Sequence, residues 1–131
     1  MITELENIGK RPPSDLALEE IVLGACMLEK PAFDSVADIL KPETFYSEKH
    51  QLIFEAFLAL FGANEPVDLM TVATQLMSTK KLEAVGGPQK IAELTGKVSS
   101  SANILYHARI LQQYYLKRKL IGLGNQLVAQ G

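Results

Sequence analysis

The chain has 131 residues, of which 47% are hydrophobic, and this is enough for one domain with a buried core. Its net charge of −2 argues against a dedicated nucleic-acid binder, which needs a strongly basic surface to meet phosphates. The single cysteine, Cys26, excludes an internal disulfide, and no segment approaches the roughly 20 apolar residues of a membrane span or resembles a signal peptide. We therefore expect a cytoplasmic domain that does not contact a membrane, with Cys26 as a buried structural thiol.

Three regions are predicted along the chain. Residues 1–13 show little apolar periodicity and contain one glycine and two prolines, so we expect a mobile arm. Residues 14–100 are predicted to form a globular helical head. Residues 101–131 are predicted to form a long helix.

The first two helices of the head are defined by their caps and by prolines. The first begins after Ser14 or Asp15, either of which can serve as N-cap, and is expected to end before Pro31. The second is expected to continue to Leu40 and to end before Pro42, because proline lacks a backbone donor. The predicted core-facing residues are Leu18, Ile21, Val22, Ala25 and Leu28 in the first helix, and Ala32, Phe33, Val36, Ala37 and Leu40 in the second.

Three more short helices complete the predicted head. The third, capped by Ser47, is apolar nearly all round and therefore belongs in the middle, and Gly62 is expected to be its left-handed C-terminal cap. The fourth begins at Asp68, and the fifth follows the turn Gly86–Pro88, with proline in its first position. The predicted core-facing residues are Leu52, Ile53, Ala56, Phe57 and Leu60, then Leu69, Val72, Ala73, Leu76 and Met77, then Ile91 and Leu94.

The last predicted helix opens at an Asn103 cap and continues without proline to about Val128, roughly 39 Å at 1.5 Å per residue. It carries two apolar stripes. These are Ile110, Tyr114, Ile121 and Val128 on one side, and Leu116, Leu120, Leu123 and Leu127 on the other. One small domain cannot cover both stripes, so the second predicts a packing partner, either another helix of a longer chain or a second copy. Since no segment alternates with period two, the predicted fold class is all-α: a compact bundle of about five short helices followed by one long C-terminal helix.

The sequence lacks the groupings of residues that an enzyme site requires. The turn Gly86–Pro88 places a proline where a phosphate-binding loop needs an amide. His50 and His107 are far apart in the sequence, and with one cysteine they are too few for a zinc site; each is interpreted as a packing or surface group in the first turn of a helix. We therefore predict no catalytic residue, no metal and no cofactor in this chain.

Charged residues are unevenly distributed. Residues 1–65 hold 12 acidic and 5 basic side chains, whereas residues 66–131 hold 3 acidic and 8 basic ones. Most are interpreted as solvated helix surface, including the carboxylate pairs Glu19–Glu20 and Asp34–Asp38. The run Lys117–Lys119 lies beside Tyr114 and Tyr115, but successive helical residues point about 100° apart and cannot form one stripe. We interpret this run as the charged rim of an apolar interface that the two tyrosines anchor.

Six segments carry a resemblance to a known family through their joint order and spacing. They are Pro13–Leu28 (PSDLALEEIVLGACML), Lys41–Ala56 (KPETFYSEKHQLIFEA), Pro66–Leu76 (PVDLMTVATQL), Leu82–Gly87 (LEAVGG), Ala102–Ile110 (ANILYHARI) and Lys117–Ile121 (KRKLI). Together they resemble the N-terminal domain of bacterial replicative DNA helicases of the DnaB family, over about residues 13–128.

This resemblance implies a parent protein that forms a ring of six subunits, encircles DNA and hydrolyses ATP with Mg in a separate C-terminal motor. It implies that the N-terminal domains pair into a collar that binds primase and influences the helicase loader. It also implies a helical hairpin, whose first arm ends near Gly131. We expect the interface with the second copy or partner to include Ile110, Tyr114, Leu116, Leu120 and Leu123. The family offers no catalytic residue to carry over to this chain.

The sequence leaves three other classes of function open. An unrelated helical adaptor would use the same apolar stripes for a different partner and would not bind a cognate primase. A helix-turn-helix DNA-binding domain would bind duplex DNA with an affinity that falls steeply as salt rises, although the acidic first half argues against it. Detectable ATP hydrolysis by this chain would indicate an enzyme.

Overall fold

The computed structural model describes residues 12–98 and 100–130, and within these ranges the chain is helical, without a strand. The predicted all-α class, with five short helices followed by one long helix, is confirmed. The elements are α2 (Leu16–Leu28), α3 (Lys30–Val36), the 3₁₀ turn η1 (Pro42–Thr44), α4 (Glu48–Gly62), α5 (Leu69–Ser78), the 3₁₀ turn η2 (Glu83–Val85), α6 (Gly87–Gly96) and α7 (Ile104–Gln130). Most of the predicted mobile arm, residues 1–11, lies outside the described residues.

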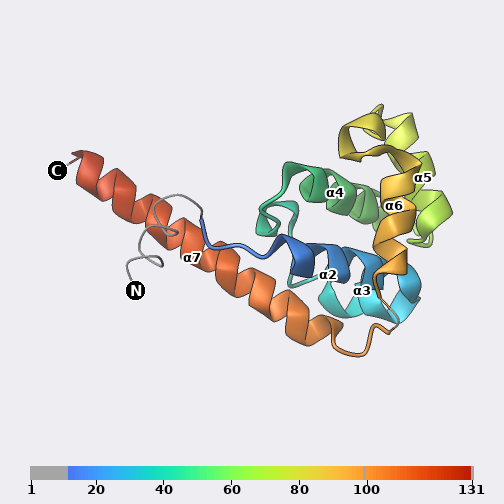
Figure 1. Ribbon diagram of the computed structural model, residues 1–131, viewed down its shortest axis with the longest axis horizontal. Helices are drawn as coiled ribbons and strands as arrows, with labels where there is room; N and C mark the ends of the chain where they lie inside the picture. The colour runs from blue at the N-terminus through green and yellow to red at the C-terminus, as the bar shows by residue number, and fades with distance from the viewer. Residues whose placement is uncertain (1–11, 99, 131) are drawn as a thin grey trace.

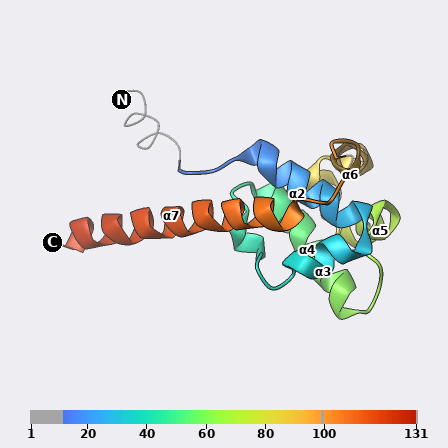
Figure 2. The same ribbon diagram turned by 90° about the horizontal axis from the view of Figure 1, so that it is seen from below.

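The short helices α2 to α6 form a head, and α7 lies along one side of it (Figure 1). The first part of α7 contacts α2, α3 and η1, and its C-terminal part extends well beyond the head (Figures 1 and 2). Inside the head, α4 contacts α2, α5 and both 3₁₀ turns. A helix with neighbours on several sides must be apolar around most of its circumference, as the sequence of α4 is.

Two predicted N-terminal caps, Asp15 and Ser47, and the predicted helix start at Asp68 are confirmed. The Asp15 carboxylate accepts a hydrogen bond from the Leu18 amide at 3.0 Å and so begins α2. Ser47 caps α4, and at the start of α5 Asp68 exchanges hydrogen bonds with Thr71, each side chain accepting from the backbone amide of the other. These contacts satisfy amides that have no partner inside the helix. Local sequence signals therefore set where these helices begin.

α2 ends at Leu28, before Pro31 as predicted, and Pro31 lies in the first turn of α3, where proline costs no hydrogen bond. Two other predicted helix ends are wrong. α3 ends at Val36, before the predicted Leu40, because the amides of residues 39 and 40 both turn back to the Val36 carbonyl. Gly62 is still helical, and the left-handed residue after α4 is Asn64, with φ of 63°.

The core is centred on aromatic side chains of α3, α4 and the segment after η1. Phe33, Phe45, Phe54 and Phe57 are fully buried, and the Phe54 ring centroid lies 5.2 Å from that of Phe45 and 5.9 Å from that of Phe57. Burying each such side chain stabilises the fold by roughly 1.5–3 kcal/mol. Met77, predicted to face inward, is exposed on α5.

The close packing of α2 on α6 depends on one glycine. A Cβ atom at Gly24 would lie 2.1 Å from the Leu94 carbonyl oxygen, so no larger residue fits without moving a helix. Cys26, two residues further on, is completely buried as predicted, and burial raises the pKa of its thiol.

Candidate interaction surface of the long helix

The first half of α7 packs on the head through a narrow row of residues. Ile104, Ala108 and Leu111 are buried, at the spacing of one helix face. This row was not predicted from the sequence. The predicted stripe begins instead with Ile110 and Tyr114. The buried row is hard to recognise because its continuation along the helix is polar: Tyr115 and then Arg118.

The second half of α7 presents a stripe of exposed leucines, defined here as the leucine stripe: Leu116, Leu120, Leu123 and Leu127. Their side chains are 52%, 67%, 54% and 69% exposed. Their spacing of three and four residues puts them on one helix face, and Leu120, Leu123 and Leu127 follow Arg118, the last residue of α7 with a hydrogen bond to the head among the described residues. An exposed row of large apolar side chains on a small domain marks a surface that packs against another protein segment.

The five predicted interface residues do not share one face. At about 100° per residue, Leu116, Leu120 and Leu123 fall within about 60° of one another, while Ile110 and Tyr114 lie about 80° to 180° away from them around the helix. Ile110 and Tyr114 are also partly buried. Val128, on the same predicted stripe as Ile110, has a side chain outside the described part of the structure.

Arg118 fixes the point at which α7 leaves the head. Its Nη1 donates to the Pro13 carbonyl at 2.9 Å and its Nη2 to the Thr44 carbonyl at 2.8 Å. Its guanidinium lies 5.5 Å from the ring centroid of Tyr46 and 5.7 Å from that of Tyr115, within range of a cation–π interaction. Arg118 was predicted to belong to the charged rim of an apolar interface, but it packs against the head, where its planar donors satisfy two backbone carbonyls.

The two lysines beside Arg118 remain on the surface. Lys117 lies 5.7 Å from the Tyr114 ring centroid, and Lys119 lies 5.5 Å from that of Tyr115. Partial burial lowers the pKa of Arg118, and the charge of Glu19 opposes that effect. Arg118 therefore differs from its neighbours in both burial and partners.

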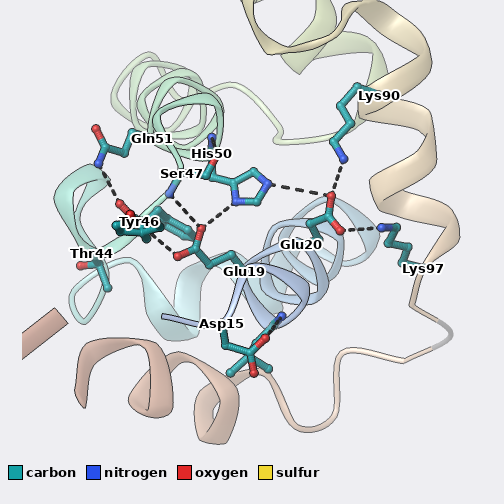
Figure 3. Close-up of polar contacts among 12 residues, drawn as sticks. Asp15, Glu19, Glu20, Thr44, Tyr46, Ser47, His50, Gln51, Lys90 and Lys97 are labelled. Atoms are coloured by element: carbon teal, nitrogen blue, oxygen red, sulfur yellow. Dashed lines mark hydrogen bonds and ion pairs between the residues drawn. The ribbon is translucent and has the colours of Figure 1, made fainter. Parts of the chain in front are cut away.

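Glu19, which the sequence suggested was solvated, is buried in the head with 1% of its surface exposed (Figure 3). Its Oε2 accepts a hydrogen bond from the Tyr46 amide at 2.7 Å, and its Oε1 accepts from the Ser47 amide at 3.4 Å and lies 2.7 Å from His50 Nδ1. A buried carboxylate is stable only when its oxygens have such partners. Glu19 thus joins α2 to the segment before α4.

Glu20 extends this polar network to α6 (Figure 3). It accepts hydrogen bonds from Lys90 and, at 2.5 Å, from Lys97, and it lies 4.0 Å from His50 Nε2. Burial raises the pKa of Glu20, but the hydrogen bonds and charges of Lys90 and Lys97 outweigh it, so the pKa is lowered overall. The interpretation of Glu20 as a solvated carboxylate is also wrong. Both carboxylates are occupied in holding helices together.

His50 borders a cleft of about 490 Å³ that is also lined by Glu20, Lys49, Lys90 and Glu93.

Within residues 12–98 and 100–130, no group of three or more His, Cys, Asp or Glu side chains could hold a metal ion. In the same part of the chain, no helix is both long and apolar enough to cross a membrane.

Comparisons with known proteins agree on one family. Residues 11–113 match the family described as DnaB-like helicase N terminal domain. Over 115 residues, 88% of this chain, the sequence is 43% identical to the replicative DNA helicase DnaB of Rhodothermus marinus, and over 120 residues, 92% of this chain, it is 38% identical to that of Geobacillus stearothermophilus. The chain spans only 12% and 26% of those two proteins.

A solved structure matches the fold. The crystal structure of the N-terminal domain of DnaB helicase from Mycobacterium tuberculosis superposes with a TM-score of 0.88 at 38% sequence identity. The match covers 91% of this chain and 83% of that one.

Proposed function

Because this chain belongs to the family of DnaB-like helicase N-terminal domains, we propose that it is the collar domain of a replicative DNA helicase. In this role it pairs with a second copy of itself and helps to form the surface on which primase docks. The whole protein forms a ring of six subunits in the cytoplasm and encircles DNA, which this domain does not bind tightly by itself.

One observation supports this proposal above the others: the leucine stripe is exposed on α7, and most of it follows Arg118, the point at which α7 leaves the head. Among the described residues, Leu116, Leu120 and Leu123 remain exposed. Burying these side chains against a partner would stabilise the resulting complex. A second helix, from another copy or from the same protein, fits a face of this length and spacing. We propose that the face including Ile110 and Tyr114 contributes less directly, because these side chains are already partly buried on the head.

We propose that this domain has no catalytic activity of its own. Two carboxylates of the head, Glu19 and Glu20, are engaged in hydrogen bonds that hold helices together. ATP and Mg would be bound by a separate C-terminal motor, and the helicase loader would meet the assembled ring. A purified chain that hydrolysed ATP would contradict this part of the proposal.

The pairing proposal is tested by light-scattering mass across a concentration series of the chain, with and without the helicase-binding domain of the cognate primase. The test variant is Leu116→Asp with Leu120→Asp, which places two charges on the leucine stripe. A matched control is Asn125→Asp with Gln126→Asp, which adds the same charge at exposed polar positions of the same helix.

We expect a dimer that forms with increasing concentration in the wild type and the control, and a monomer with weakened primase binding in the leucine variant. Equal mass and equal primase affinity in all three proteins would contradict the role of the leucine stripe. A chain that binds duplex DNA with a steep salt dependence would favour the helix-turn-helix alternative.

A further inference from the structure

A small cavity opens at the C-terminal end of α4, between α3 and the segment that follows α4. It has a volume of about 140 Å³ and is lined by residues 30, 33, 34, 61 and 64–67. Cavities that enclose a whole small-molecule ligand usually measure about 300–1,000 Å³. This cavity therefore has room for a single side chain of a partner and is too small for a cofactor.

The turn at the end of α4 brings one side of the cavity into place. Asn64 has a φ of 63°, in the left-handed region, and the Glu65 amide donates a hydrogen bond to the Leu60 carbonyl at 2.9 Å. This reversal ends the helix and places Glu65 and Val67 in the same cavity lining as Phe61. Since α4 has 15 residues, its C-terminal end also brings the partial negative charge of a helix dipole to the cavity.

The apolar wall of the cavity contains two phenylalanines. Phe33 is buried, whereas Phe61 is 49% exposed, and the two rings meet edge to face with their centroids 5.2 Å apart. Pro66 and Val67 continue this wall. The core thus holds the Phe61 ring in place while much of its surface remains open. The face of an aromatic ring carries partial negative charge and attracts cations.

The charged side chains of the lining are two carboxylates and one ammonium. Asp34 on α3 and Glu65 are both exposed, and in the described part of the chain neither forms an ion pair with another side chain. Lys30 supplies the opposing positive charge. Two carboxylates, the end of α4 and the Phe61 ring together outweigh this one ammonium, so the cavity favours a guest that is positively charged.

We propose that this cavity binds an arginine side chain of a partner protein. The aliphatic stem of arginine packs against the apolar wall, and its planar guanidinium lies over Phe61 and donates to Asp34 and Glu65. The head already holds Arg118 by the same chemistry, with the guanidinium 5.5 Å from the Tyr46 ring centroid and hydrogen-bonded to backbone carbonyls. Arginine is also enriched among the residues that contribute most to protein interfaces. The inference does not rest on the proposed collar function, because it uses no residue of the leucine stripe.

The test is an NMR titration of the 131-residue chain with N-acetyl-arginine methylamide as the probe. We expect saturable shifts of the backbone amides that line the cavity, with a dissociation constant of about 10 mM, because the probe is one side chain without the rest of a partner. N-acetyl-citrulline methylamide has nearly the same shape without the charge and should bind at least about fivefold more weakly. Equal binding of the two probes, or shifts confined to other parts of the chain, would overturn the proposal.

Substitutions of the charged lining residues should change the affinity in opposite directions. Asp34→Asn with Glu65→Gln removes both carboxylates and should weaken binding of the arginine probe about tenfold. Lys30→Gln removes the opposing cation and should strengthen binding about twofold. The matched control is Asp38→Asn, which removes an exposed carboxylate outside the lining and should leave the affinity unchanged. Unchanged affinity in the double variant, or weaker binding in Lys30→Gln, would contradict a site for a cation.

The role of the aromatic ring is tested by Phe61→Leu, which keeps an apolar side chain and removes the ring face. We expect this variant to bind the arginine probe about threefold more weakly than the wild type. The charge variants alter exposed positions and should retain the fold, which their NMR spectra report directly. If Phe61→Leu does not fold, the charge variants and the citrulline probe still decide whether the cavity selects arginine.

Discussion

Glu19 Oε1 and His50 Nδ1 lie 2.7 Å apart in the interior of the head, and they connect α2 to the first turn of α4. The same carboxylate accepts the Tyr46 amide, so the start of α4 is held by a side chain from another helix as well as by its own cap, Ser47. This arrangement explains how a glutamate can be buried in the head.

Replacing Glu19 should destabilise the chain more than replacing an exposed carboxylate. Glu19→Ala leaves the Tyr46 amide and His50 without a buried partner, and we expect a loss of about 3 kcal/mol in the free energy of unfolding. Urea unfolding measures this loss. The control is Glu55→Ala, which removes a half-exposed partner of Lys81 at 3.8 Å and should cost less than about 1 kcal/mol. Equal losses would mean that the buried network contributes little.

Substitution by alanine should destabilise the chain at Gly24 and stabilise it at Gly122. At Gly24 the new Cβ would meet the Leu94 carbonyl, and we expect a loss of about 2 kcal/mol or more from overpacking. At Gly122, in the exposed part of α7, nothing lies within 4 Å of the added Cβ, and alanine should raise helix stability by up to about 1 kcal/mol. Urea unfolding and circular dichroism measure the two effects. A Gly24→Ala protein as stable as the wild type would contradict the close packing of α2 on α6.

The Glu20 contacts should give stability that depends on pH. Because Lys90 and Lys97 lower the pKa of Glu20 in the folded chain, its stabilising contribution is present above the ordinary carboxyl pKa and is lost as the pH falls through the folded value. The difference in unfolding free energy between the wild type and Glu20→Gln should therefore be largest near neutral pH and shrink in acid. Urea unfolding at several pH values measures this difference, and a difference that grew on acidification would contradict the assigned direction.

Cys26 should be chemically inert in the folded chain. It is completely buried, and burial raises the pKa of its thiol, so the reactive thiolate is scarce. A chromogenic thiol reagent should react with it only after unfolding in urea. Asn125→Cys, at an exposed position of α7, provides a thiol that should react at once in the native protein. Prompt modification of two thiols in that variant would show that Cys26 is accessible.

The sequence predicts most of the helices because the signals that begin them are local. Asp15, Ser47 and Asp68 each cap a helix through an amide three residues away, so a short window of sequence contains both partners. Helix ends were predicted less well, as Leu40 and Gly62 illustrate. α3 stops at Val36, before Leu40, and Gly62 is still helical, because a residue near a helix boundary is compatible with either side of it.

The leucine stripe was also predictable, since its spacing alone places its four side chains on one face of α7. The face of α7 that contacts the head could not be predicted from the sequence. Its row, from Ile104 to Leu111, continues to Arg118, and a charged residue breaks the apolar pattern by which such a face is recognised.

By itself, the sequence determined the helical class, the caps and the unpaired leucine stripe, because these depend on residues three or four positions apart. Only the tertiary structure decided that Glu19 is buried and that Arg118 packs against the head. The partners of Glu19 are 27 to 31 residues away along the chain, and those of Arg118 are 105 and 74 residues away. No local pattern distinguishes a charged residue that will find such distant partners from one that remains in water, because the hydrogen bonds that make burial favourable exist only after the helices have packed.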